Sequence, residues 1–106
     1  MTPVDAEPEP RVVDGAGEHR YELWVGDRRA GLIEYETKPG LVVLIHTEVD
    51  PAFGGRGLAT RLIAGAIADI RARGLKMVAV CPFVREYLKK HPEDRDLVVG
   101  ASALRD

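Results

Sequence analysis

A glycine-rich segment in the middle of the chain contains the residue types that hold a phosphate group. Gly54, Gly55 and Gly57 surround Arg56, and an amphipathic helical pattern begins at Leu58. Glycine lets backbone N–H groups approach a ligand closely, and the first amides of a helix have no partner within the helix. These amides and the positive end of the helix dipole favour an anion. The segment therefore predicts an anion-binding turn, although a simple strand-to-helix connection can use the same residues.

Cys81 and His46 are the residues best suited to acyl or proton transfer. Cys81 ends an apolar segment directly before Pro82, a residue that favours the first turn of a helix. A thiol at a helix N-terminus has a lowered pKa and is a better nucleophile, but most single cysteines are small buried residues. His46 interrupts an apolar segment before the glycine turn and could accept a proton from an amine. Glu48 is the alternative base, and His46 could instead be an ordinary solvent-facing residue.

Length, composition and charge exclude several classes of function. The chain has 106 residues, 45% of them hydrophobic and 30% charged, with a net charge of −2. This indicates one globular domain at 11–106, following a disordered tail at 1–10 that holds three prolines and three acids. The negative charge disfavours nucleic acid, and no apolar segment reaches the roughly 20 residues of a membrane helix. With one cysteine and no metal-ligand spacing or leader peptide, we expect no disulfide, no metal and a cytoplasmic location.

Hydrophobic periodicity in the first half of the chain predicts strands. Segment 19–25 alternates apolar and polar residues, and a Gly26-Asp27 turn leads to a second extended segment at 28–37. The apolar start of 41–49 predicts a third strand that is buried on both faces. Three antiparallel strands in sequence are the simplest arrangement, to which 11–13 could add a short strand.

The second half predicts a helical crossover. From 57 to 73 the apolar residues recur with the period of a helix, and Gly74 is placed to end it. The apolar segment 75–81 is then a strand parallel to the third, reached by a right-handed connection. A short helix at 83–90 and a brief last strand at 97–99 follow. The predicted order is β-β-β-α-β-α, an α+β fold with a mixed, mainly antiparallel sheet.

Three motifs along the chain resemble those of the minimal single-domain members of the Gcn5-related N-acetyltransferase family, and they follow one another in the same order as in that family. Gly57-Leu58-Ala59 is similar to the end of the family's pyrophosphate motif, Gln/Arg-x-x-Gly-x-Gly/Ala. His46-Thr47-Glu48-Val49 precedes the turn, and Cys81-Pro82-Phe83-Val84 with His91-Pro92 follows it. The resemblance implies a small acetyltransferase-like fold over nearly the whole ordered chain.

The resemblance also implies an activity, which is transfer of an acetyl group from acetyl-CoA to the amine of a protein, a peptide or a small molecule. The candidate residues for coenzyme binding are Val49, Gly54, Gly55, Arg56, Gly57, Leu58 and Ala59. Arg61, one helical turn past Gly57, is a further candidate for a coenzyme phosphate, although it could equally be a solvent-facing residue of the helix. The resemblance places Cys81 beside the thioester and makes His46 the candidate base. Direct transfer is the usual route of the family, although Cys81 could take the acyl group first.

Two features depart from the pattern of the family. The leading Gln/Arg of the pyrophosphate motif falls on Gly54, so the expected side chain is missing there. Few residues follow Lys90, so the strands that shape the acceptor site in larger relatives are mostly missing. The alternative function is therefore a non-catalytic acyl-CoA-binding or protein-interaction module. The sequence does not specify the amine or the oligomeric state.

Overall fold

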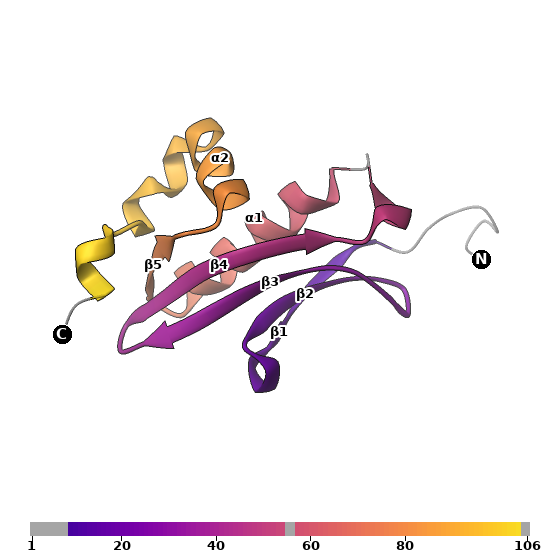
Figure 1. Ribbon diagram of the computed structural model, residues 1–106, viewed down its shortest axis with the longest axis horizontal. Coiled ribbons are helices and arrows are strands. Elements are labelled where there is room, and N and C mark those ends of the chain that lie inside the picture. Colours follow the sequence, from indigo (N-terminus) through magenta and orange to yellow (C-terminus); the bar gives the residue numbers. More distant parts are fainter. Residues whose placement is uncertain (1–8, 55–56, 105–106) are drawn as a thin grey trace.

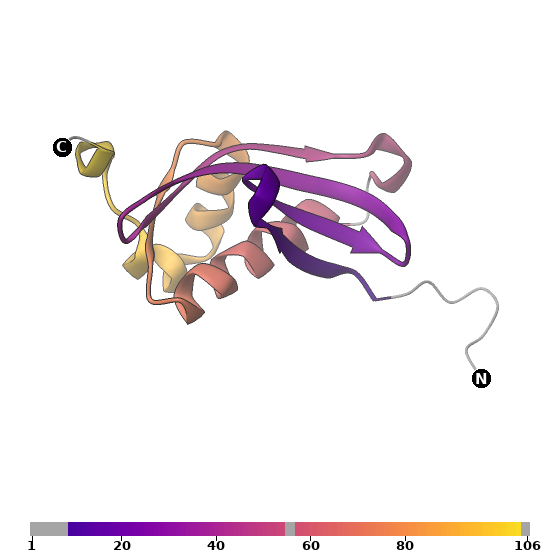
Figure 2. The ribbon, with the colours of Figure 1, turned by 90° about the horizontal axis from the view of Figure 1, so that it is seen from below.

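Five strands form one sheet in the computed structural model, which describes residues 9–54 and 57–104 (Figure 1). The sheet has the order β1-β2-β3-β4-β5, and its strands are β1 (Arg11–Gly15), β2 (Arg20–Val25), β3 (Arg28–Lys38), β4 (Leu41–Val49) and β5 (Lys76–Ala79). Both α-helices, α1 (Leu58–Ala72) and α2 (Pro82–Lys90), lie on one face of this sheet (Figure 2). The short 3-10 helices are η1 (Ala16–Glu18), η2 (Pro51–Phe53), η3 (Pro92–Leu97) and η4 (Ala101–Leu104). The predicted α+β class is confirmed.

The antiparallel part of the sheet has four strands where the simplest prediction had three. β1 pairs with β2 from Arg11 opposite Trp24 to Gly15 opposite Arg20. The sequence indicated this strand only as a possibility at 11–13, so the predicted element order lacks it. The physical reason is its place at the edge of the sheet. Val13 remains 38% exposed, so the segment lacks the buried alternating residues that identify a strand.

The core forms between the apolar stripe of α1 and the facing side of the sheet. All predicted members of this stripe are buried, with exposures of 6% or less: Leu58, Leu62, Ile63, Ala66, Ile67 and Ile70. They pack against sheet residues that include Leu23, Ile33 and Leu44, which are fully buried. Each such side chain contributes roughly 1.5–3 kcal/mol by leaving water. Gly74, with a φ of +68°, follows the helix end as predicted.

A polar cluster fixes the C-terminal half of α1 against the first strands. The Tyr21 hydroxyl donates to Asp69 of α1 at 2.7 Å, and the Tyr35 hydroxyl donates to Asp14 of β1 at 2.6 Å. Arg73 bridges both carboxylates, at 3.1 Å from Asp69 and 2.6 Å from Asp14. Burial, and then the bond to Asp14, raises the pKa of Tyr35 to about 12. Both phenols therefore remain neutral donors at physiological pH.

The backbone of α1 approaches β1 closely at Gly65. A Cβ atom at this position would lie 2.5 Å from Cγ2 of Val12, closer than real contacts allow. The glycine therefore makes room for the valine side chain. This contact sets the distance between α1 and the edge strand of the sheet.

We expect Gly65→Ala to destabilise the protein by about 1–2 kcal/mol, because overpacking outweighs the gain in helix propensity. In a Val12→Gly background the obstructing atoms are gone, including the Cβ of Val12, which would lie 2.8 Å from the new Cβ. There the same Gly65→Ala change should stabilise the protein, by up to about 1 kcal/mol. Urea unfolding of the wild type, the two single variants and the double variant gives the effect of Gly65→Ala on the free energy of unfolding in each background. An effect of the same sign in the two backgrounds would contradict the proposed contact.

The pairing between β4 and β5 ends halfway along β4. The two strands are parallel, and their register ends at Leu44 opposite Ala79. The amides of Val80 and Cys81 then both donate to the carbonyl of Leu44, at 3.0 Å each. The register between β3 and β4 also shifts here, so that Ile45 is an extra residue in β4. The second half of β4, residues 46–49, therefore stays paired with β3 but has no partner on its β5 side, because the other chain segment turns away into α2.

The two ends of the chain differ from the predictions in separate ways. The strand predicted at 97–99 is wrong, because Leu97 ends η3 and Val98 forms only an isolated parallel bridge with Met77. A 3-10 helix begins at Pro92 and leaves too few residues for a strand. Of the predicted disordered tail at 1–10, residues 1–8 lie outside the described part. Within the described residues, neither helix has the length and apolar content that crossing a bilayer requires.

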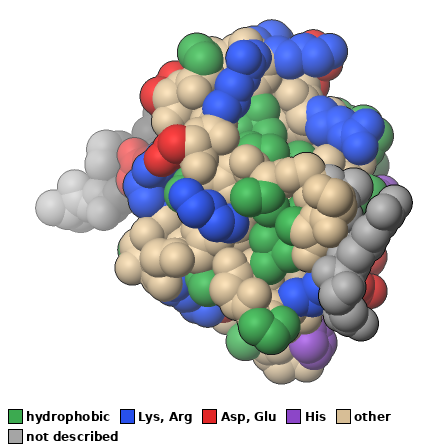
Figure 3. All heavy atoms as spheres, turned by 90° about the vertical axis from the view of Figure 1, so that its left-hand side faces the viewer, with side chains coloured by type: hydrophobic (Ala, Val, Ile, Leu, Met, Phe, Trp, Pro, Cys, Tyr) green, Lys and Arg blue, Asp and Glu red, His purple; other side chains and the backbone are tan. Residues whose placement is uncertain are grey.

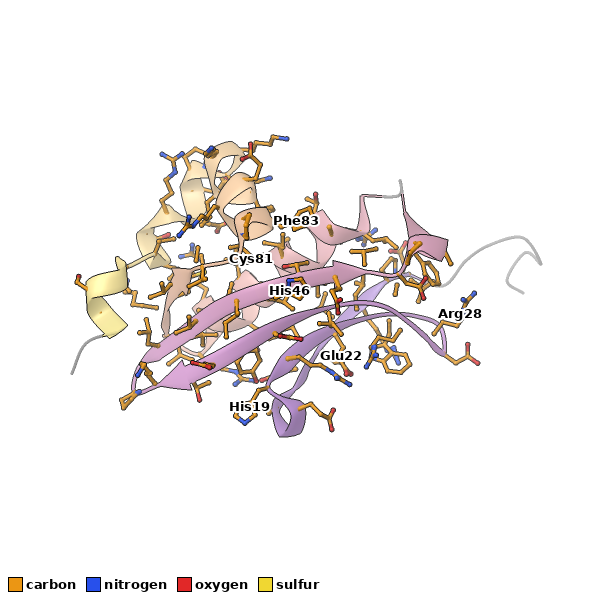
Figure 4. All side chains as sticks on the ribbon, viewed as in Figure 1. His19, Glu22, Arg28, His46, Cys81 and Phe83 are labelled. Atoms are coloured by element: carbon orange, nitrogen blue, oxygen red, sulfur yellow. The ribbon has the colours of Figure 1, made fainter. Side chains whose placement is uncertain are left out.

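On the face of the sheet opposite the helices, Glu22 of β2 lies in a polar region (Figure 4), apart from the second apolar cluster of Leu41, Val43 and Val78. Only 9% of Glu22 is exposed, and its carboxylate accepts bonds from Arg20 at 2.7 Å and from Trp24 at 3.2 Å. Arg29 adds a longer contact of 3.5 Å. The bond from Arg20 is the main reason that the pKa of Glu22 is lowered. These contacts satisfy a buried charge and hold β2 and β3 together.

We expect Glu22→Gln to destabilise the protein by about 1–2 kcal/mol at neutral pH, since bonds to charged groups are lost. A carboxyl with a lowered folded pKa contributes stability above its unfolded value, and this contribution is lost as the pH falls through the folded pKa. The difference between variant and wild type should therefore shrink below about pH 4. Denaturant unfolding across this range, with exposed Glu34→Gln as the control, measures it. A difference independent of pH would exclude the ionised carboxylate as its cause.

Candidate active site

The N-terminus of α1 presents free backbone amides at the predicted phosphate turn. Gly57 is the N-cap, with a φ of +69°, and no side chain within 9–54 and 57–104 caps the helix. The first bond into the helix runs from the amide of Arg61 to the carbonyl of Gly57, at 3.3 Å. Among the described residues, no group accepts from the three amides at 58–60. Their positive dipole is therefore available to an anion. The predicted contacts of Gly55 and Arg56 lie outside the described residues.

A groove leads from these amides along the half of β4 that has no partner on its β5 side. Its volume is about 260 Å³, and most of its lining is apolar. It is lined by Thr47, Val49, Phe53, Gly54, Gly57, Leu58, Ala59 and Phe83. Phe83 extends from the start of α2 with 61% of its surface exposed (Figure 4). A narrow apolar groove that ends at uncapped amides suits a ligand with an extended arm and an anionic group.

Cys81 and Thr47 meet where β4 and β5 diverge. The Thr47 hydroxyl lies 3.2 Å from Sγ of Cys81, and either atom can donate. Both side chains are buried, with exposures of 5% for Thr47 and 1% for Cys81. Cys81 is also the N-cap of α2, as its position before Pro82 predicts. Sequence reasoning missed Thr47, although its alternation with His46 places it on the core-facing side of the strand.

His46 lies on the opposite face of the sheet from Cys81. Its ring is 53% exposed, and Nε2 lies 3.5 Å from Oε1 of Glu48, which is 61% exposed. Successive side chains of a strand point to opposite faces, so Thr47 contacts the thiol and the two candidate bases do not. The structure thus brings His46 and Glu48 together on the outer face. Their role in proton transfer stays a prediction.

Arg61 and His91 occupy the two helices that flank the groove. Arg61, a predicted coenzyme contact, is half-exposed and forms an ion pair with Glu9 at 3.2 Å. A ligand phosphate would have to compete with this exposed pair, which is weak in water. His91 stacks on Tyr87 with ring centroids 3.9 Å apart and is the C-cap of α2. This is the helix-end position that the sequence indicated.

Comparison with known proteins identifies the group to which this geometry corresponds. The sequence pattern of a family described as GCN5-related N-acetyl-transferase matches residues 20–97. Protein NATD1 of Xenopus tropicalis is 39% identical over 66 residues, which cover 62% of this chain and 60% of that protein. Protein NATD1 of Homo sapiens is 38% identical over a match that covers 62% of this chain and 58% of the relative. The chain therefore spans about 60% of the length of these relatives.

A solved structure has the same arrangement of elements. The solution structure of a GCN5-like protein from Staphylococcus aureus superimposes with a TM-score of 0.64 and 24% sequence identity. The superposition covers 85% of this chain and 88% of the other. At this identity the similarity shows the fold alone.

Proposed function

This chain belongs to the GCN5-related N-acetyltransferase family, and we propose that it transfers an acetyl group from acetyl-CoA to an amine. One observation carries the proposal: the start of α1, where no side chain of the described residues caps the helix, lies at the end of a groove that follows β4 where it has left β5. A family member needs both parts, because one must hold a diphosphate and the other an extended thioester arm.

The described residues suggest how the coenzyme is held. The amides at the start of α1, after Gly57, would donate to the diphosphate. The pantetheine arm would follow the inner edge of β4 past Val49 and Thr47, where no β5 residue is paired. Exposed Phe83 would cover its apolar part from the α2 side. The acetyl group would then lie near Cys81.

The chemistry has two balanced routes from this position. In direct transfer, the amine nitrogen attacks the acetyl carbon, the carbon–sulfur bond breaks, and the amine proton passes to a base while coenzyme A leaves as a thiolate. An amine arriving from the outer face of the sheet would meet His46 and Glu48, the candidate bases there. In the second route the thiolate of Cys81 first takes the acetyl group and releases coenzyme A, and the amine then attacks this new thioester.

The burial of Cys81 favours a second candidate function. With 1% of its surface exposed, the thiol reaches neither ligand nor solvent unless the strands open further. A module that binds acyl-CoA without transferring the acetyl group would leave this thiol as a packing residue. Mass spectrometry of a panel of amines incubated with acetyl-CoA separates the two functions. Acetylated product supports the transferase, and coenzyme binding without any product supports the module.

Thermal unfolding in the presence of acetyl-CoA, coenzyme A and ATP tests the proposal directly. A ligand at a hundred times its Kd stabilises the folded state by about 2.7 kcal/mol, which raises Tm by several degrees in a domain of this size. We expect acetyl-CoA and coenzyme A to raise Tm and ATP to have little effect. Equal shifts with ATP would indicate a general nucleotide site, and the absence of any shift would contradict coenzyme binding.

A further inference from the structure

A second groove shares no lining residue with the proposed coenzyme site. It has a volume of about 530 Å³ and is formed by β5, α2 and the segment that follows η3. Its floor is apolar and consists of Val78, Val80, Val98 and Val99. Val80 is 42% exposed although it directly precedes the buried Cys81. On this side of the molecule Figure 3 shows hydrophobic side chains in a central band, with Lys and Arg side chains on both sides of it.

Two arginines at this groove are fixed by the backbone and not by carboxylates. Nε of Arg85 donates to the carbonyl of Ala79 at 2.9 Å, and Nε of Arg95 donates to the carbonyl of Leu88 at 3.2 Å. Each bond uses one nitrogen and leaves the terminal nitrogens of the guanidinium available. Within the described ranges, neither arginine has an ion pair, whereas Arg71 is paired with two carboxylates. These two arginines therefore carry positive charge without a carboxylate partner among the described residues.

Lys89 and the edge of β5 also indicate a positively charged groove that is open to an extended chain. Lys89 lines the groove and has only an exposed contact with Glu86, at 3.4 Å, within the described part of the chain. Along the side of β5 away from β4, the amide of Val99 donates to the carbonyl of Met77 at 2.9 Å, and the carbonyl of Ala79 accepts from Arg85. An extended backbone has room to lie over the valine floor. Aromatic side chains, which would stack nucleic-acid bases, are missing from the described lining.

We propose that this groove binds an extended acidic segment of a partner protein. Carboxylates of the segment would bind the terminal nitrogens of Arg85 and Arg95, whose planar groups match a carboxylate in two-point contact. Successive side chains of an extended segment point to opposite sides, so every second side chain would face the valine floor. Apolar residues at these positions would pack there. The site goes beyond the acetyltransferase proposal and does not depend on it.

Fluorescence anisotropy of the full chain with a short labelled peptide that alternates Glu and Val tests the proposal. The control peptide carries Gln in place of every Glu. We expect the acidic peptide to bind at low ionic strength at least about tenfold more tightly than the Gln peptide, and to weaken as salt is added. This comparison needs no variant. Equal binding of the two peptides would overturn the proposal.

The double variant Arg85→Gln, Arg95→Gln locates the site. It should weaken binding of the acidic peptide at least about tenfold, because two charge-assisted contacts are lost. The matched control, Arg11→Gln with Arg28→Gln, removes the same charge from arginines that lie over Trp24 and Phe53 instead. It should change the affinity less than about twofold. Equal losses in the two double variants would mean that only net charge matters and would overturn the assigned site.

Two measurements on the wild-type protein complete the test. Peptide-induced changes in the amide NMR spectrum should centre on 78–80 and 98–100, and changes confined to other regions would overturn the proposal. Sedimentation velocity tests the competing occupant, a second copy of this chain. The proposal would be overturned in favour of self-association if the wild-type protein forms a dimer, the Arg85→Gln, Arg95→Gln variant does not, and the peptide fails to dissociate the dimer. A monomer at all concentrations supports it.

Discussion

Gly57→Glu is expected to weaken acetyl-CoA binding by about a hundredfold or more, which corresponds to about 2.7 kcal/mol. A carboxylate at the N-cap of α1 would lie among the amides proposed to hold the diphosphate. Like charges at about 4 Å repel by roughly 4 kcal/mol near a protein surface. A Cβ atom at Gly57 would meet no other atom of the described part of the chain within 4 Å, so the side chain has space. Isothermal titration calorimetry with acetyl-CoA measures the loss.

Gly40→Glu is the matched control for this change. Gly40 has a φ of +71°, nearly the value of Gly57, and a Cβ atom at this position would also have nothing within 4 Å. Both substitutions therefore impose a similar left-handed strain of roughly 1–2 kcal/mol and add the same charge. Gly40 lies in the turn between β3 and β4, away from the groove. Gly40→Glu should keep wild-type affinity, and an equal loss in both variants would contradict a phosphate site at α1.

Cys81→Ala is expected to lower kcat by about a hundredfold, with a change in acetyl-CoA affinity of less than about threefold. This loss is expected where the thiol is the acyl acceptor, since direct transfer with coenzyme A leaving as a thiolate does not require it. The thiol lies at the divergence of β4 and β5 and not at the amides of α1, so binding of the diphosphate should persist. Steady-state kinetics and calorimetry give the two quantities separately.

Two further variants separate chemistry from packing. Val84→Ala removes volume from a fully buried site on the same helix and should reduce stability without a comparable loss of kcat. Thr47→Val keeps the volume at the partner position but removes the hydroxyl that lies 3.2 Å from Sγ. It should lower kcat less than Cys81→Ala does. Full activity of Cys81→Ala would assign the thiol to packing and remove it from the mechanism.

The elements of the fold could be predicted because their signals are local. The bounds of β4 agree with the predicted strand at 41–49, and α1 begins and ends within one residue of 57–73. A continuous apolar start and a helical stripe are properties of neighbouring residues, and every predicted stripe residue is buried. Elements at the edge of the sheet were harder to predict from the sequence, as β1 and the segment at 97–99 show. Few of their side chains are buried, so periodicity identifies them poorly.

The candidate site could be predicted in part, for the same reason. The glycine turn and the position of Cys81 before a helix are sequence features, and both are where they were expected. The partner of the thiol was not predicted, because Thr47 lies 34 residues away and meets Cys81 only across two diverging strands. The motif instead indicated His46. Because side chains alternate along β4, His46 lies on the face of the sheet opposite Cys81.

By itself, the sequence determined the helix start at Gly57, the buried strands and the family, all of which depend on residue types at short separations. Only the tertiary structure decided where β4 and β5 part, which side chain faces the thiol, and that Arg85 and Arg95 have no ion-pair partner within the described residues. These properties depend on strand register, on the extra residue Ile45 and on packing between distant segments. Local periodicity contains none of this information, because a shift of one residue in register turns every side chain to the opposite face.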